Sequence, residues 1–327
     1  MSFANIRGQD WAIALLRRGI ETGRLPHALL FTGPKGVGRF LTAVTVAKAL
    51  NCLGGTPGDC CDRCLACIKI TKGVHPDVHL VAPEGASLKI DQIRGLTQEA
   101  TFKPYEGRRK VFILDLAETM TEQAQNALLK TLEEPPGAAV LVLIAPEASA
   151  LLSTIASRCS QIRFGPLPEH AVAARLMEEG YEGEEAHFLA SLARGSLGRA
   201  QELRNSPLEE IRGLVEQAFA LPAGKTLPVL DLAERVVRQK EILSLFVEAL
   251  LTWCRDLTVS KVTHRETLLA NRSCAAALRR QSEPLALVQL LGMYHTVKQT
   301  LDGLSRHANP RLSLEVMLLK LRDLQAA

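Results

Sequence analysis

The sequence of 327 residues has few aromatic side chains, little net charge and no long apolar run. Aromatic residues make up 4% of the chain and the net charge is +4, which argues against a protein that stacks bases on exposed rings or binds phosphates through a strongly basic face. The longest apolar run, Ala138 to Pro146, is too short to cross a bilayer, and the N-terminus lacks the features of a signal peptide. We therefore expect a cytoplasmic protein without membrane contact.

The chain is longer than one hydrophobic core usually fills, so its length predicts two or three domains. Up to residue 165, apolar runs typical of buried strands alternate with helical patterns. The five runs are Ala28–Phe31, Val78–Val81, Val111–Asp115, Ala139–Ile144 and Gln161–Phe164. This alternation predicts an α/β fold with a doubly wound parallel sheet, in which ligands bind at the carboxyl ends of the strands. From Leu167 onward the pattern is helical throughout.

Five of the eight cysteines fall between residues 52 and 67, and in a reducing cytosol such a cluster indicates metal ligands before disulfides. Cys52, Cys61, Cys64 and Cys67 have the spacing C-x8-C-x2-C-x2-C, and four thiolates form a closed tetrahedral zinc site with a structural role. Cys60 could replace Cys61, although the two-residue spacing to Cys64 favours Cys61. The alternative is a set of free or disulfide-bonded cysteines.

A glycine-rich loop follows the first apolar run and leads into a helix. Gly33 and Gly38, with Gly36 between them, have the spacing of the phosphate-binding loop G-x-x-x-x-G-K-[ST], but Arg39 replaces its lysine and Phe40 its hydroxyl residue. The glycines keep the backbone N–H groups that hold phosphate oxygens, whereas Phe40 offers magnesium no ligand. The loop thus keeps the shape of a nucleotide site and lacks part of its chemistry.

The apolar run that ends at Asp115 supplies the second half of that site. In phosphate-loop hydrolases this acid helps to hold magnesium and a water-activating glutamate often follows it, but here Leu116 follows. Losing the hydroxyl and the glutamate together predicts that ATP is not hydrolysed. Three alternatives stay open: a tight turn with no ligand, weak binding of an anion or nucleotide without turnover, and a divergent ATPase that uses Arg39 and Asp115.

Arg158, in the stretch Ser157-Arg158-Cys159, is the candidate for a catalytic role on another subunit. An arginine supplied by a neighbour stabilises charge on a transferring phosphate and accelerates the reaction by about 10³–10⁵. The alternative is an ordinary surface salt bridge, which the pattern alone favours.

Four stretches together resemble the subunits of the bacterial DNA polymerase III clamp loader, which are AAA+ proteins. They are Arg109–Asp115, Ala117–Thr121, Gln125–Pro136 and Thr154–Cys159. The four-cysteine insert after the phosphate-loop helix is a further likeness, and Asn309–Glu315 resembles the family's final helix. Because the gamma/tau subunits keep the loop's lysine and threonine and hydrolyse ATP, this chain resembles the branch of the family that has lost them.

The resemblance implies an AAA+ domain over residues 1–165 with the zinc module at 52–67, a helical lid at 166–206 and a helical collar at 207–327. The collar would join the chain to gamma/tau and delta subunits in a five-subunit ring. That ring opens the sliding clamp and loads it on primer-template DNA.

The same resemblance implies roles for single residues. Ser157, Arg158 and Cys159 match the family's trans-acting motif, so Arg158 would reach the ATP bound to an adjacent gamma/tau subunit. Arg199 matches the second-sensor position, although no nucleotide is expected in this chain. A third interpretation, a zinc-dependent nucleic-acid-binding module, is opposed by the scarcity of aromatics and the mild charge.

Overall fold

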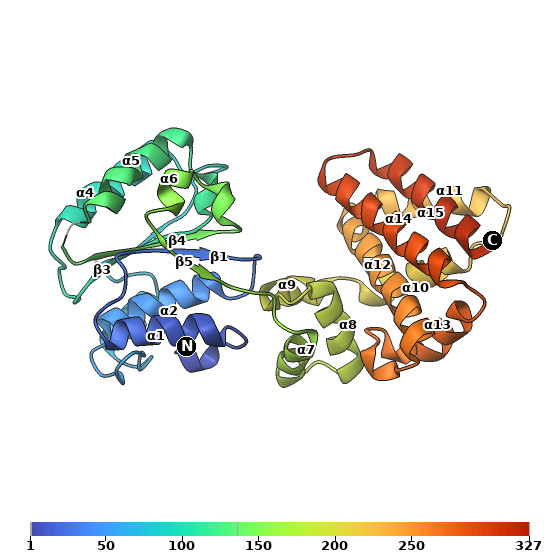
Figure 1. Cartoon of the computed structure of the whole chain (residues 1–327), viewed down its shortest axis with the longest axis horizontal. Coiled ribbons are helices and arrows are strands. Elements are labelled where there is room, and N and C mark those ends of the chain that lie inside the picture. The colour runs from blue at the N-terminus through green and yellow to red at the C-terminus, as the bar shows by residue number, and fades with distance from the viewer. Residues whose placement is uncertain (1, 136, 327) are drawn as a thin grey trace. The chain divides into compact units, whose positions relative to one another are not determined.

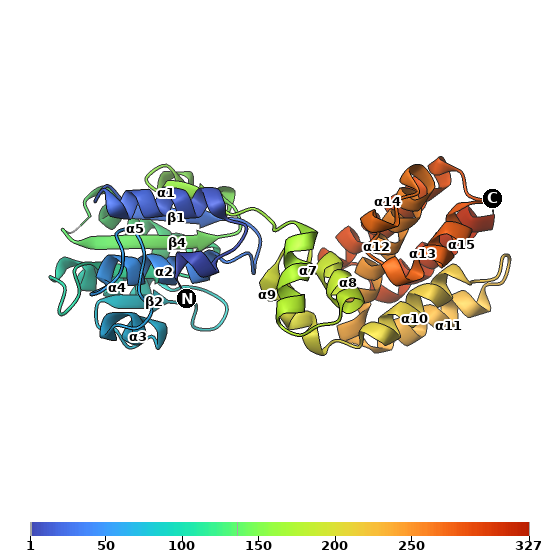
Figure 2. The same ribbon diagram turned by 90° about the horizontal axis from the view of Figure 1, so that it is seen from below.

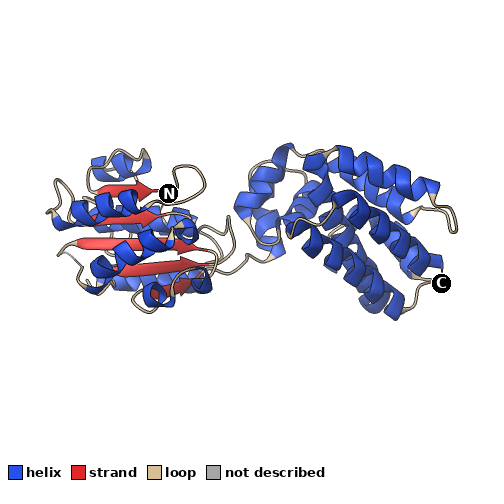
Figure 3. Ribbon diagram, turned by 90° about the horizontal axis from the view of Figure 1, so that it is seen from above, coloured by secondary structure: helices blue, strands red, loops and turns tan. Residues whose placement is uncertain are grey.

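The computed structural model describes residues 2–135 and 137–326, so Pro136 at the end of one family-like stretch lies outside the described residues. The chain forms two compact units. The first contains the described residues up to Pro168 together with Ser196–Arg199, and the second contains Glu169–Gly195 and the residues from Ala200 onward. Strands occur in the first unit, and the second is built from helices (Figure 3).

The first unit is organised around a five-stranded sheet in the order β2-β3-β4-β1-β5. The strands are β1 (Ala28–Thr32), β2 (Val78–Val81), β3 (Lys110–Leu114), β4 (Ala139–Ala145) and β5 (Ser160–Arg163). Every neighbouring pair is parallel, so the carboxyl ends of all five strands lie along one edge. β1, β3 and β4 are buried along their whole length, which explains their continuously apolar sequences.

Helices cover both faces of this sheet (Figure 1). One face packs against α1 (Asp10–Glu21) and α2 (Arg39–Asn51), and the other against α4 (Ile90–Thr101), α5 (Glu122–Glu133) and the short α6 (Ser153–Ala156). Successive strand residues alternate between the two cores: Leu29 and Phe31 join the α1/α2 core, whereas Leu30 joins the α4/α5 core. The predicted doubly wound parallel sheet is confirmed.

A short helix, α3 (Leu65–Thr71), belongs to the first unit and is part of the cysteine-rich segment (Figure 2). Its first residues follow Cys64, and its inward-facing residues Cys67 and Ile70 are buried. The segment therefore forms a small module beside the helix that follows the glycine-rich loop, with which α3 is in contact.

The chain after residue 168 is all-helical, as the sequence predicts. Its helices are α7 (Glu169–Glu178), α8 (Gly183–Ala193), α9 (Leu197–Glu202), α10 (Leu208–Phe219), α11 (Leu227–Arg238), α12 (Lys240–Thr263), α13 (Ala275–Ser282), α14 (Leu287–Ser305) and α15 (Pro310–Ala326). The long α12 lies against α10, α13 and α14, and its buried Trp253 packs 6.1 Å from the ring of Phe219. Among the described helices none has the length and hydrophobicity of a membrane span.

Candidate functional site

The glycine-rich loop joins the end of β1 to the start of α2, at the edge formed by the carboxyl ends of the strands. Gly33, Gly36 and Gly38 have φ angles of 143°, 76° and 98°, which favour glycine. At Gly33 a side chain would also collide with the backbone, because an added Cβ would lie 2.1 Å from the carbonyl oxygen of Phe164. Asp115 follows β3 at the same edge, so the loop and this acid lie together.

Arg39, which replaces the lysine of a working loop, points into the protein. The residue is 8% exposed, and its guanidinium donates a hydrogen bond to the carbonyl oxygen of Ala145 at the end of β4. Burial lowers the pKa of Arg39, and the negative charges of Glu118 and Asp115 oppose that shift. The guanidinium is therefore bonded to the chain's own backbone, near two of its carboxylates, at the place where a hydrolase would hold phosphate and magnesium.

The other groups at this edge do not supply the missing chemistry. Phe40 is 41% exposed at the start of α2, and Leu116 is 40% exposed with a left-handed backbone, φ 52°. The Asp115 carboxylate accepts a hydrogen bond from the N–H of Leu116, at 3.0 Å. Neither Phe40 nor Leu116 has an atom that binds magnesium or deprotonates water, so of the three positions Phe40, Asp115 and Leu116, Asp115 alone has the side chain that a hydrolase uses there.

Arg39 has a structural role that a substitution tests. In Arg39→Met the carbonyl of Ala145 loses its donor, and the carboxylates of Asp115 and Glu118 lose a neighbouring cation. We expect the free energy of unfolding to fall by about 1–3 kcal/mol, measured by urea denaturation. The control is Phe40→Ala at the next, half-exposed position, where we expect a change within about 0.5 kcal/mol. Equal stability of Arg39→Met and the unaltered chain would show that the buried hydrogen bond contributes nothing.

The turn Ser196–Arg199, which belongs to the first unit, lies against the loop. The N–H of Gly198 donates to the carbonyl oxygen of Gly36 at 3.0 Å, and the N–H of Arg199 donates to the Ser196 hydroxyl at 3.0 Å. Arg199 is half-buried in the first turn of α9. Gly198, rather than Arg199, is the residue of the turn whose backbone bonds to the glycine-rich loop, and no sequence signal had singled it out.

Arg158 lies between α6 and β5, and its guanidinium is bonded within the chain. One nitrogen pairs with the carboxylate of Glu133 at 2.6 Å, and another donates to the carbonyl oxygen of Thr154 at 3.0 Å. The side chains of Arg158 and Glu133 are 37% and 49% exposed, so this is a surface ion pair. Such a pair contributes between zero and about 1 kcal/mol, which leaves Arg158 available to a stronger anionic partner.

The two neighbours of Arg158 play different parts. The Ser157 hydroxyl donates to the carbonyl oxygen of Thr154 at 3.1 Å and is exposed. Cys159 packs in the core beneath α4 and α5, and burial raises the pKa of its thiol to about 11. The thiol is therefore protonated at neutral pH and anchors the segment by packing, with Arg158 left at the surface.

Cys52, Cys61, Cys64 and Cys67 converge, with all four sulfur atoms within 4.8 Å of one another. Cys52 Sγ lies 3.9 Å from Cys64 Sγ and 3.7 Å from Cys67 Sγ. A tetrahedron of sulfur atoms about 2.3 Å from a zinc ion has edges of roughly 3.8 Å, so this spacing fits the ion. All eight cysteines, which lie within the described ranges, are free of disulfide bonds. The predicted four-cysteine cluster is thus present and could hold a metal ion.

Backbone N–H groups donate hydrogen bonds to sulfur atoms of this cluster, which favours the thiolate form that metals bind. The N–H of Cys61 donates to Cys52 Sγ, and the N–H of Cys64 donates to Cys61 Sγ, both at 3.3 Å. Burial acts to raise the pKa of the Cys64 thiol, but hydrogen bonds from the N–H groups of Cys67 and Leu53 outweigh it and lower the pKa to about 6. Burial raises the pKa of Cys67, so that thiol requires the attraction of a cation to ionise.

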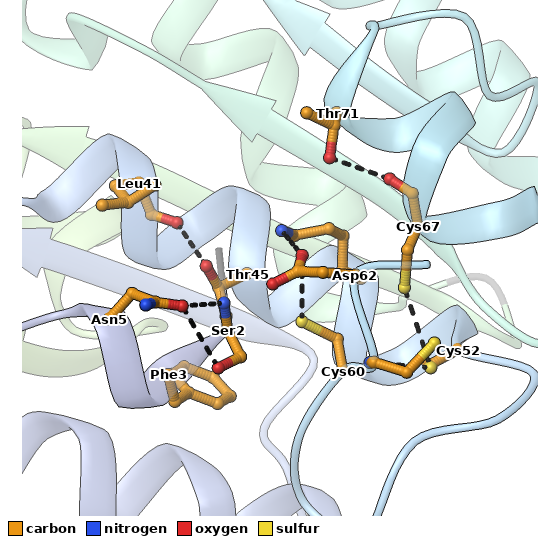
Figure 4. A network of polar contacts seen from close by, with 12 residues as sticks. Ser2, Phe3, Asn5, Leu41, Thr45, Cys52, Cys60, Asp62, Cys67 and Thr71 are labelled. Carbon is orange, nitrogen blue, oxygen red and sulfur yellow. Dashed lines mark hydrogen bonds and ion pairs between the residues drawn. The ribbon is translucent and has the colours of Figure 1, made fainter. Parts of the chain in front are cut away.

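Cys60 is not part of this cluster. Its sulfur lies 3.8 Å from the carboxylate of Asp62, and burial raises the pKa of the thiol to about 11 (Figure 4). Asp62 in turn forms an ion pair of 2.5 Å with Lys48, whose side chain is 2% exposed on α2. The choice of Cys61 over Cys60 therefore agrees with the geometry, and a partly buried ion pair joins the module to the helix of the glycine-rich loop.

Comparison of the sequence with known proteins gives matches to subunits of DNA polymerase III. A family model described as "DNA polymerase III, delta subunit" matches residues 8–168. The delta' subunit of Pseudomonas aeruginosa is 31% identical over 301 residues, covering 90% of this chain and 91% of the relative. The delta' subunit of Bacillus subtilis is 39% identical over 211 residues and 64% of each chain.

The chain also resembles subunits of the other type. The tau subunit of Escherichia coli is 30% identical over 328 residues, covering 99% of this chain and 47% of tau. The chain thus spans less than two thirds of the length of the E. coli and B. subtilis relatives. Among solved structures, a gamma-subunit-related protein of Thermotoga maritima is 22% identical with a TM-score of 0.43, covering 96% of this chain and 99% of that one.

Proposed function

Since the chain belongs to the delta' family of DNA polymerase III clamp-loader subunits, we propose that it is a clamp-loader subunit that does not itself hydrolyse ATP. The observation that carries the proposal is the state of the glycine-rich loop. Arg39 is buried against Ala145, and Phe40 and Leu116 replace groups on which hydrolysis depends. The chain would instead act on ATP held by a neighbour, in a five-subunit ring with gamma/tau and delta subunits that loads the sliding clamp on primer-template DNA.

The proposed contribution to the neighbour is Arg158. It is at the surface, its partner Glu133 is half-exposed, and the buried Cys159 fixes the segment from below. A phosphate carries more charge than one carboxylate and accepts two parallel hydrogen bonds from a guanidinium, so it would displace the weak pair with Glu133. Ser157 would stay at the rim of that contact.

We further propose that the four cysteines hold a structural zinc ion. The sulfur spacing fits tetrahedral zinc, and four thiolates leave no open position for substrate or water. When bound, the ion would fix residues 52–67 as one module. The ion pair of Lys48 with Asp62 would then hold α2 against the fixed module.

The test is ATP turnover by the purified chain alone. We expect no magnesium-dependent phosphate release above background, and no difference between the unaltered chain and Asp115→Ala, because Phe40 and Leu116 do not supply the groups with which Asp115 would have to act. Measurable turnover that Asp115→Ala abolishes would overturn the proposal.

The alternative is a divergent ATPase of the gamma/tau type that uses Arg39 and Asp115. It is favoured by the tau relatives, which match this chain along 98–99% of its length. The same assay separates the two, since this alternative requires turnover by the isolated chain. Against it stands the inward orientation of Arg39, which a phosphate would have to reverse.

A further inference from the structure

The start of the chain lies beside the cysteine-rich module, as Figure 4 shows for Ser2 and Phe3. The N–H of Phe3 donates a hydrogen bond to the carboxylate of Asp59 at 3.1 Å, although the two residues are 56 positions apart. The same carboxylate oxygen accepts a hydrogen bond from the N–H of Cys60 at 2.7 Å. Asp59 is not a member of the four-cysteine cluster. It therefore joins the module to the start of the chain without being a candidate metal ligand.

The loop that carries Asp59 runs from Cys52 to Cys61 and contains no helix or strand. An added Cβ at Gly55 would lie 2.5 Å from the carbonyl oxygen of Asp59 and 3.0 Å from Cys52 Sγ, so the loop folds tightly onto one of the candidate ligands. At the two ends of the loop, the N–H of Cys61 donates to Cys52 Sγ. Because a metal ion bound by both cysteines would hold these ends together, metal binding is expected to fix the position of Asp59.

The N-terminal segment, residues 3–9, belongs to the core of the sheet unit. Phe3 and Ile6 are 1% and 6% exposed and pack in the α1/α2 core. The side-chain amide of the buried Gln9 donates to the carbonyl oxygens of Val37, at 3.3 Å, and Gly165, at 2.8 Å, and its oxygen accepts the N–H of Gly165 at 3.2 Å. Val37 is in the glycine-rich loop, and Gly165 follows β5. The segment therefore connects the cysteine-rich module to the glycine-rich loop and to the end of β5.

We infer that the cysteine-rich module is a metal-dependent latch for the N-terminal segment, and that Asp59 is the residue that connects the two. With the metal bound, Asp59 holds the backbone of Phe3 and the segment stays packed. Without the metal, the loop between Cys52 and Cys61 loosens and the segment is released. Gln9 then loses its bonds to the glycine-rich loop and to the end of β5, so the state of the metal site affects both. This inference rests on the proposed zinc site and gives that site a role beyond its own fold.

The test is hydrogen exchange, followed by mass spectrometry, on the full chain loaded with zinc and on the same chain after removal of the metal with EDTA. We expect exchange at residues 3–9 to become at least about tenfold faster without the metal, and to slow again when zinc is added back. β4, whose residues are all buried, is the internal reference and should change less. An equal rise in β4 would show general unfolding and would overturn the latch, as would unchanged exchange at residues 3–9.

Asp59→Ala separates the latch from the metal site, because it removes the acceptor of the Phe3 N–H and leaves the four cysteines in place. We expect the zinc-loaded variant to retain its metal and yet to exchange residues 3–9 at least about tenfold faster than the zinc-loaded unaltered chain. The matched control is Asp91→Ala, which removes a carboxylate that is 85% exposed in the first turn of α4 and should exchange like the unaltered chain. Slow exchange at residues 3–9 in zinc-loaded Asp59→Ala would overturn the latch.

Metal analysis of the same samples distinguishes failure of the latch from failure of the proposed function. Absence of zinc from the native protein would contradict the proposed zinc site and the latch together. Bound zinc, with residues 3–9 exchanging alike in its presence and absence, would contradict the latch alone. ATP turnover by the purified chain tests the non-hydrolysing role and depends on neither result.

Discussion

Arg158→Ala should lower ATP turnover at the adjoining subunit's site by about 10³-fold while leaving the chain folded. The loss of rate follows from removing the cation that would stabilise charge on the transferring phosphate. The fold should survive because Arg158 makes only a surface ion pair and one hydrogen bond to a carbonyl, so stability should change by no more than about 1 kcal/mol. Single-turnover kinetics of the assembly reconstituted with gamma/tau and delta would resolve the slowed site as a separate phase.

Two variants control for indirect effects of this substitution. Glu133→Gln removes the carboxylate that holds Arg158 in the isolated chain, and turnover should be maintained or rise because the guanidinium is released. Arg94→Ala removes another surface arginine, one paired with Asp91 on α4, and should leave turnover unchanged. Unchanged turnover in Arg158→Ala would show that this residue is an ordinary surface arginine.

Cys64→Ser should abolish metal binding and destabilise the sheet unit by about 3 kcal/mol or more. The sulfur lost is 3.9 Å from Cys52 and accepts hydrogen bonds that favour the thiolate, so three ligands would remain around an incomplete tetrahedron. Metal analysis should find about one zinc ion per chain in the unaltered protein and none in the variant. Hydrogen exchange should show residues 52–67 opening, as it should after chelation.

Cys60→Ser is the matched control for the metal site. Its sulfur faces Asp62 and not the cluster, so the variant should keep its zinc and its protected module. Loss of metal in Cys60→Ser with retention in Cys61→Ser would reassign the ligand. Absence of zinc from the native protein would remove the ion from the proposal altogether.

The sheet could be predicted because its strands are buried on both faces, which leaves continuous apolar runs such as β3 and β4 in the sequence. The start of the first helix depends on a contact that is distant in the sequence: α1 begins at Asp10, after Gly8, which has a φ of 72° and sits where a Cβ would collide with Leu167. The short helix α3 is not predicted from the sequence, because it is too short to show a long periodic apolar pattern. Its position depends on the cysteine spacing and on its buried face.

The candidate site could be predicted only where local spacing encodes it. The cysteine spacing and the glycine positions are local, and the structure brings each set together. Two other contacts join residues that are far apart in the chain: the bond from Arg39 to Ala145 and the ion pair of Arg158 with Glu133. No local sequence motif predicts such contacts. The contact of Gly198 with Gly36 is of the same kind, since neither glycine's neighbours indicate the other.

The most direct measurement of the division of labour is ATP turnover by gamma/tau and delta, assembled with and without this chain and compared with this chain alone. We predict no turnover by the chain alone, an increase when it joins the other subunits, and loss of that increase with Arg158→Ala. In this proposal the chain does not hydrolyse ATP itself, and its Arg158 acts on ATP bound to the adjacent subunit. Turnover by the isolated chain, or equal turnover of the assembly with and without it, would contradict that proposal.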